Sequence, residues 1–302
     1  MFIVKNRIIF FILSAVLVIG SFVAMYSYGF NFGIDFKGGS LTEVRYLDAR
    51  PAVEQVKSDL STVDLGSYII SPSGDTNYII KSRELNQDEK GFVIRALSHN
   101  GEVGLKEERF NSIGPAVGNE LKQKAFTAIA VVILCIVLFI TFAFRKVSFP
   151  VASWKYGVAT IIALAHDVII PAGVFVAWCH FKGGEVDLLF VTALLAILGY
   201  SVHDTIVVFD RVRENLHGGH SSKTTETFEE TVGKSVTQTF GRSINTSLTI
   251  FLALVALYFI GGETTRNFAF VLLVGVIAGT YSSIFVASPL LVVLEGKNSS
   301  KK

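Results

Sequence analysis

The chain has 302 residues, of which 51% are hydrophobic and 17% charged, with a formal net charge of +2 and a mean hydropathy of +0.52. This hydrophobic content exceeds what a soluble domain needs and indicates a polytopic membrane protein. The near-neutral charge without a basic and aromatic patch speaks against nucleic-acid binding, and two cysteines indicate neither a disulfide framework nor a metal site.

Apolar runs of about 20 residues, the length that crosses a bilayer, occur six times along the sequence. The first follows basic residues, as in a signal peptide, but its apolar run is too long for one, so we expect a retained anchor. The predicted spans are Ile8–Tyr28, Ala125–Phe144, Tyr156–Trp178, Leu188–Phe209, Ile244–Gly261 and Phe268–Leu291.

A long polar segment, residues 29–124, separates the first two spans and shows a mixed α and β pattern. Its alternating and helical spacings predict the order βαββαβ, which is that of a small ferredoxin-like domain with helices on one sheet face. The predicted strands are Leu41–Leu47, Ser67–Ser71, Asn77–Ser82 and Val103–Phe110, and the helices are Pro51–Val63 and Glu89–His99.

The distribution of Lys and Arg orients the spans, because positive residues in short loops stay in the cytoplasm. We therefore expect both termini, a loop at about 210–243 and a tail at 292–302 to be cytoplasmic, and residues 29–124 to be extracytoplasmic. On the cytoplasmic side lie Lys5, Arg7, Arg145, Lys146, Lys155, Arg211, Arg213, Lys223, Lys234, Arg242, Lys297, Lys301 and Lys302, against Lys182 and Arg266 in the opposite short loops.

Ionisable residues inside two spans are the strongest functional signal. His166 and Asp167 fall near the middle of the third span, and His203 and Asp204 in the inner half of the fourth. An Asp at mid-helix costs roughly 2.5–3.5 kcal/mol, which favours a functional group facing the protein interior over polar packing contacts worth about 0.6 kcal/mol each. Neighbours on a helix point about 100° apart, so we expect at most one of each pair, the aspartate, to point inward.

Asp204 is expected to carry a transferred proton, with Arg242 setting its affinity for that proton. Asp204 lies about 9 Å inside the cytoplasmic edge, and the long side chain of Arg242 reaches over such a distance, so the geometry allows an ion pair. Protonation would weaken this pair and let the helices repack. The start of the fifth span around it is polar, with Ser243, Asn245, Thr246, Ser247 and Thr249.

The other polar residues receive more modest predictions. For Asp210, beside Arg213, we favour an interfacial cap and surface pair. His203 has two possible roles, a proton shuttle or a neutral, hydrogen-bonded histidine in the core, and we favour the second. Asp167 stays open between a second proton site and a packing hydrogen bond. Motifs for phosphate binding, metal binding or a catalytic nucleophile are lacking, so an enzyme is not expected.

Four segments, in chain order, carry a family resemblance: NFGIDFKGGS (31–40), GPAVGNEL (114–121), YSVHDTIVVFDRVREN (200–215) and YSSIFVA (281–287). They resemble motifs of the SecD/SecF family, the accessory subunits of the Sec translocase. His203 departs from the family, which often has Asn there. The Gly38-Gly39 pair in the first motif also has a structural explanation, a tight turn in which positive φ is needed. We favour this explanation over a functional role for the two glycines. The first motif is matched by Gly33, Asp35, Phe36, Gly38 and Gly39.

The resemblance implies an α-helical polytopic membrane protein of the bacterial inner membrane, with six transmembrane helices forming half of an RND-type bundle. It implies export of unfolded preproteins driven by the proton motive force, together with SecD, the SecYEG channel and the SecA ATPase, with YajC and YidC as further candidate partners and no cofactor. The fourth-span Asp and fifth-span Arg that matter in the family match Asp204 and Arg242. Two alternatives stay open: an RND-type efflux half-transporter, for which the outer segment is small, and a structural scaffold for SecD.

Overall fold

The structure, a computed structural model, describes residues 2–144, 152–221 and 226–296. The chain divides into a helical unit, Met1–Asn31 with Thr127–Lys302, and an α+β unit, Phe32–Phe126. The α+β unit lies within a few residues of the predicted polar segment 29–124. Of the basic residues used to predict orientation, Arg145, Lys146, Lys223, Lys297, Lys301 and Lys302 lie outside the described residues, as does most of the predicted tail.

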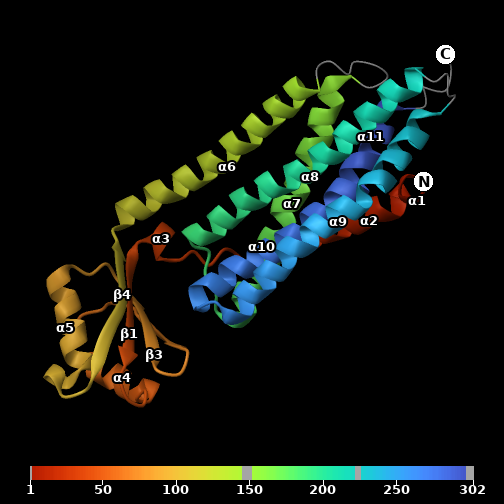
Figure 1. Cartoon of the computed structure of the whole chain (residues 1–302). Helices are drawn as coiled ribbons and strands as arrows, with labels where there is room; N and C mark the ends of the chain where they lie inside the picture. Colours follow the sequence, from red (N-terminus) through yellow and green to blue (C-terminus); the bar gives the residue numbers. More distant parts are fainter. Residues whose placement is uncertain (1, 145–151, 222–225, 297–302) are drawn as a thin grey trace. The chain divides into compact units, whose positions relative to one another are not determined.

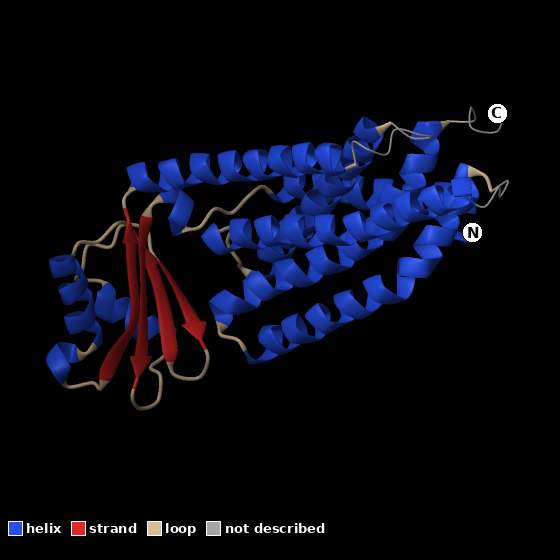
Figure 2. Ribbon diagram, turned by 45° about the horizontal axis from the view of Figure 1, so that its top comes forward, coloured by secondary structure: helices blue, strands red, loops and turns tan. Residues whose placement is uncertain are grey.

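The α+β unit is an antiparallel sheet in the order β2-β3-β1-β4, with two helices on one face (Figures 1 and 2). This confirms the predicted ferredoxin-like βαββαβ order. Pro72 and Ser73, which lie beyond the predicted strand Ser67–Ser71, extend the second strand, and the turn falls at Gly74, whose φ is +57°. The elements are β1 (Gly39–Tyr46), α4 (Val53–Leu60), β2 (Ile69–Ser73), β3 (Asn77–Ser82), α5 (Gln87–Leu97) and β4 (Leu105–Ile113), with the short helices α3 (Ile34–Lys37) and η1 (His99–Gly101).

The core of this unit lies between the sheet and its two helices. Alternate residues of β1 and β3 meet residues at helical spacing on α4 and α5, as the apolar pattern predicts. A capping box starts α5: the Asn86 side chain accepts from the Glu89 N–H, and the Glu89 carboxylate accepts from the Asn86 N–H. The buried core residues are Val44, Tyr46, Val56, Leu60, Leu65, Tyr78, Ile80, Leu85, Val93 and Leu97.

Six helical segments are long and apolar enough to cross a membrane, which confirms the six-span prediction. Two begin well before the predicted spans, because the polar residues that precede each apolar run continue the same helix. The segments are α2 (Arg7–Tyr28), which follows the short α1 (Phe2–Lys5), α6 (Pro115–Ala143), α7 (Ser153–Lys182), α8 (Leu188–Ser221), α9 (Phe228–Ile260), and the run of α10 (Glu263–Ser282), the π-helical η2 (Ser283–Ala287) and α11 (Ser288–Glu295).

Helices α7, α8 and α10 form the interior of the helical unit, with half or more of their span residues buried, whereas α2, α6 and α9 are mostly exposed. Glycine allows the closest approaches. A Cβ on Gly275 would lie 2.1 Å from Ile197 Cδ1, and one on Gly173 would lie 2.3 Å from Ser21 Cβ. Both described chain ends lie at one end of this unit (Figure 1), which we call the terminal end; α8 begins at the opposite end.

Candidate functional site

Asp204 is a buried acidic residue on α8, with 7% of its surface exposed. Its Oδ1 accepts a hydrogen bond of 2.6 Å from the Ser243 hydroxyl of α9. Within the described part of the chain, its Oδ2 is buried and has no hydrogen-bond partner. The carboxyl group therefore faces the protein interior, as predicted, with only one of its two oxygens satisfied.

Arg242 is exposed, and no ion pair in the described chain joins it to Asp204. Ser243, the next residue along α9, makes the contact with the carboxylate instead, because neighbours on a helix point about 100° apart and Ser243 faces α8. Arg242 directly precedes Ser243 in the chain, so it lies in the neighbourhood of the Asp204 carboxyl group. The predicted pair is thus close in position but not in direct contact.

His203 and Asp210 both lie on the exposed side of α8. The interpretation of His203 as a hydrogen-bonded core residue is wrong, because the helical rotation that buries Asp204 turns its neighbour outward. The surface pair predicted for Asp210 is confirmed, since its side chain is 65% exposed and its Oδ1 lies 3.6 Å from Nη1 of Arg213. The predicted cap is wrong, because α8 continues past Asp210 to Ser221.

Asp167, fully buried on α7, joins three helices through its carboxylate. Its Oδ1 lies 2.9 Å from Nδ1 of His166, and its Oδ2 accepts from the hydroxyls of Ser201 on α8 and Ser282 on α10, the latter at 2.7 Å. The expectation that only one member of this pair points inward is wrong, because α7 is surrounded by other helices here and His166 is also buried, stacked on Tyr281 at 5.9 Å.

The two buried acids differ in how well they are satisfied. Asp167 receives three hydrogen-bonding contacts, whereas Asp204 receives one. Three donors hold a carboxylate in place, while an unpartnered oxygen leaves room to bind a proton. Pro171, four residues after Asp167, also removes a backbone donor from this part of α7. Asp167 is therefore the more firmly anchored of the two, and Asp204 keeps one oxygen without a hydrogen-bond partner among the described residues.

The hydroxyl partners of these acids were not all found by sequence reasoning. Ser201 and Ser282 were missed as donors to Asp167. Tyr200 and Thr280, whose hydroxyls lie 3.5 Å apart and hydrogen-bond to neither acid in the described part of the chain, were also missed. A signal was present: hydroxyl residues inside apolar spans commonly bond across helices, and these four lie beside or within the quoted motifs at 200–215 and 281–287.

The glycine motif at 31–40 makes a tight turn inside the α+β unit. Gly38 has a φ of +81° and Gly39 one of +133°, as the turn prediction required. A Cβ on Gly38 would lie 2.7 Å from Pro115 Cα, and one on Gly39 would lie 2.7 Å from the Ser82 carbonyl oxygen. The two family-like segments at 31–40 and 114–121 therefore touch through backbone. Of the remaining motif residues, Gly33 precedes α3, Asp35 lies in its first turn, and Phe36 is buried.

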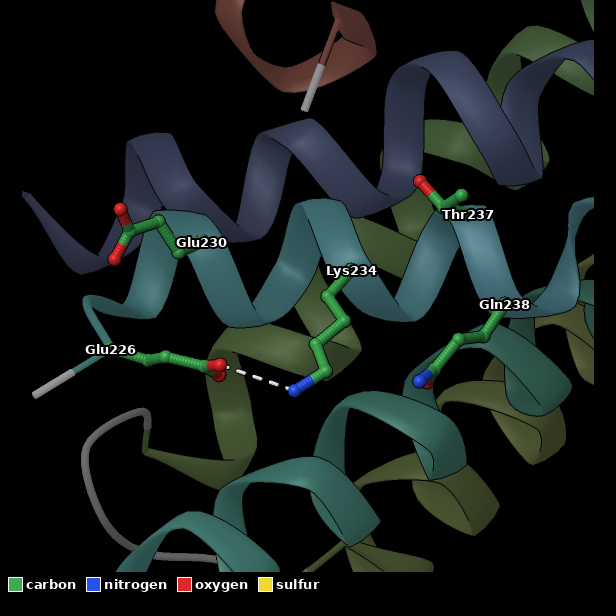
Figure 3. A pocket seen from close by; sticks show the side chains of 5 residues that line it. All are labelled: Glu226, Glu230, Lys234, Thr237 and Gln238. Atoms are coloured by element: carbon green, nitrogen blue, oxygen red, sulfur yellow. Dashed lines mark hydrogen bonds and ion pairs between the residues drawn. The ribbon is translucent and has the colours of Figure 1, made fainter. Parts of the chain in front are cut away.

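A surface pocket at the start of α9 is polar and mixed in charge (Figure 3). Lys234 Nζ lies 3.1 Å from Glu226 Oε1, so these two charges are paired, while Glu230 takes part in the capping box with Thr227. No set of three or more His, Cys, Asp or Glu side chains suited to a metal is found among the described residues. The pocket lining comprises Glu226, Glu230, Lys234, Thr237 and Gln238.

Comparison with known proteins agrees with the motif resemblance. Residues 93–297 match the family model "Protein export membrane protein SecD/SecF, C-terminal", and residues 23–46 match the SecD/SecF GG motif. The chain is 40% identical to a protein translocase subunit SecF of Thermobaculum terrenum, covering 98% of this chain and 94% of the relative. It is 36% identical to the SecF of Anaerolinea thermophila, covering 97% and 94%.

A crystal structure of a Thermus SecDF, described as a translocon-associated membrane protein, has a similar fold, with a TM-score of 0.79 and 32% sequence identity. The match covers 97% of this chain but 38% of that chain, so the Thermus protein contains a large part without a counterpart here. Together with the six spans and the ferredoxin-like unit, these matches show that the chain belongs to the SecF subunits of the SecD/SecF family of protein-export membrane proteins.

Proposed function

We propose that this chain is the accessory subunit of the Sec translocase that, with SecD, uses the proton motive force to promote preprotein export through SecYEG and SecA. Asp204 would take up and release the proton, and Arg242 would tune its affinity through space. In this proposal the chain lies in the bacterial inner membrane, the terminal end of the helical unit is cytoplasmic, and the α+β unit is extracytoplasmic. YajC and YidC remain candidate partners.

The observation that supports this proposal most directly is the buried, unpartnered Oδ2 of Asp204. A proton can bind there without breaking the hydrogen bond that Oδ1 accepts from Ser243. The new O–H would be a buried donor that needs an acceptor, whereas Oδ2 has no hydrogen-bond partner among the described residues. Protonation thus favours a rearrangement between α8 and α9, which is how proton binding would drive a conformational change.

The electrical part of the driving force has a suitable size. A unit charge that crosses the membrane field gains about 2.3 kcal/mol per 100 mV. Such an energy shifts a two-state equilibrium by more than about tenfold. Uptake of a proton at Asp204 from one side and its release to the other would therefore suffice to bias one arrangement of α8 and α9 over another.

The test is preprotein translocation into vesicles that carry this chain with SecD, SecYEG and SecA, with and without a proton gradient. Asp204→Asn should insert and assemble normally but lose the gradient-dependent part of translocation. Asp210→Asn, an exposed acid on the same helix, is the matched control and should behave as wild type. Full gradient-dependent translocation by Asp204→Asn would contradict the proposal and favour a scaffold that only stabilises SecD.

A further inference from the structure

A line of hydroxyl groups leads away from Asp204 toward the opposite end of the helical unit. Tyr200 precedes Asp204 by one turn on α8, and Ser247 follows Ser243 by one turn on α9, so both helices carry polar groups on facing sides. Because α8 and α9 run in opposite directions, Tyr200 and Ser247 lie on the same side of Asp204. That side is the one away from the terminal end.

The hydroxyl groups in this line are close enough to exchange protons. Tyr200 Oη lies 2.6 Å from Ser247 Oγ, which in turn lies 2.6 Å from Oγ1 of Thr280 on α10. Ser247 and Thr280 are buried, whereas Tyr200 is half-buried and brings the line to the surface of the helical unit. A hydroxyl both donates and accepts hydrogen bonds, which a proton relay requires of every member.

On the other side of Asp204 the interior is aromatic. Phe209, five residues further along α8, packs edge-on against Tyr156 at 5.2 Å, and Tyr156 stacks on Phe144 at 5.0 Å. All three side chains are buried, and the Tyr156 hydroxyl has no hydrogen-bond partner in the described chain. A close-packed apolar cluster offers a proton no chain of acceptors. Buried hydroxyls also lie on this side, where Thr205 bonds to Ser283 at 2.8 Å, so the aromatic cluster closes only part of the path toward the terminal end.

We propose that Tyr200, Ser247 and Thr280 form the stretch of the proton route that adjoins Asp204 on the side of the opposite end. This inference rests on the proposed function. At each step an arriving proton binds a hydroxyl oxygen, which releases its own proton to the next group, so bonds formed and broken balance. The proton reaches the Asp204 carboxylate at its unpartnered Oδ2, while Oδ1 keeps the hydrogen bond from Ser243. The Ser247 hydroxyl donates to the Ser243 carbonyl oxygen at 2.7 Å, one turn from Asp204, and the proposal places a water molecule between Ser247 and the Asp204 carboxyl group to complete the route.

The decisive variant is Ser247→Ala, in the full chain assembled with SecD, SecYEG and SecA in vesicles. The gradient-dependent rate of translocation, taken as the difference between rates with and without a proton gradient, should fall by about tenfold. Ser247→Thr keeps the hydroxyl and should restore it. Thr249→Val is the matched control: the Thr249 hydroxyl bonds to carbonyls of its own helix at 3.0 and 2.8 Å and lies outside the line, so its loss should leave the rate unchanged.

Tyr200→Phe removes a second hydroxyl, on a different helix, and should reproduce the loss even if Ser247→Ala disturbs packing. Assembly of each variant is verified by co-purification with SecD. The inference is overturned if neither variant lowers the gradient-dependent rate while Asp204→Asn abolishes it, which leaves the proposed function standing. If Asp204→Asn itself retains gradient dependence, the proposed function fails first, so the two failures are distinguishable.

Discussion

Replacing Gly38 by alanine should weaken the α+β unit in two separable ways. Its φ of 81° and ψ of 162° lie in a region that is essentially restricted to glycine, which costs an L-residue about 1–3 kcal/mol. The added Cβ would lie 2.7 Å from Cα and 2.8 Å from N of Pro115, and overpacking of this kind costs about 1–3 kcal/mol because backbone atoms must move. We therefore expect Gly38→Ala to lower the free energy of unfolding of this unit by about 2–6 kcal/mol.

Gly74→Ala isolates the backbone term. Gly74 has a φ of +57° in the same unit, and no heavy atom lies within 4 Å of where its Cβ would be. Gly74→Ala should therefore lower the free energy of unfolding of this unit by about 1–2 kcal/mol. Amide hydrogen exchange of the full chain in detergent, followed on peptides from β1 and β3, measures both changes. Equal protection in the two variants would refute the contact between the segments at 31–40 and 114–121.

Three further predictions concern the interior and the sheet unit. Asp167→Ala should lower the thermal unfolding midpoint of the helical unit in detergent, because each buried donor left without its acceptor costs about 1–3 kcal/mol. Asp167→Asn should lower the midpoint by a smaller amount. An unchanged midpoint would contradict the anchoring role of Asp167. Gly173→Ala should push α2 away from α7, since its Cβ would overlap Ser21, and should raise the labelling of a cysteine placed at Ser21. The hydrogen bond from Arg83 lowers the pKa of Glu89 in the folded protein. Ionised Glu89 therefore stabilises the fold above its unfolded-state pKa, and this stabilisation is lost as the pH falls through its folded-state pKa. Glu89→Gln should accordingly make the stability of the α+β unit less dependent on pH on the acid side.

Much of the fold follows from patterns that lie close together in the sequence. The six spans are set by apolar length, and the ferredoxin-like order by alternating and helical spacings broken at turns. Helix ends were less predictable: α9 begins at Phe228 rather than near Ile244, because polar residues that are compatible with a helix carry no apolar signal of where the helix starts.

The site was predictable in its residues but not in its contacts. The cost of burying a charge in a bilayer singles out Asp167 and Asp204 from the sequence alone. Which neighbour satisfies each acid depends on helix rotation and on contacts between spans far apart in the chain. Ser243 rather than Arg242 therefore meets Asp204, and His203 turns outward.

The π-helical segment η2 gives the last span an adjustable register. Its wider turn accommodates one more residue than an α-helical turn, and the Ser288 hydroxyl bonds to the Ser283 carbonyl oxygen across it at 2.8 Å. Converting it to α-helix would rotate all of α11 by about 100° relative to α10. Leu291, now fully buried, would turn away from its present neighbours in the interior by this rotation.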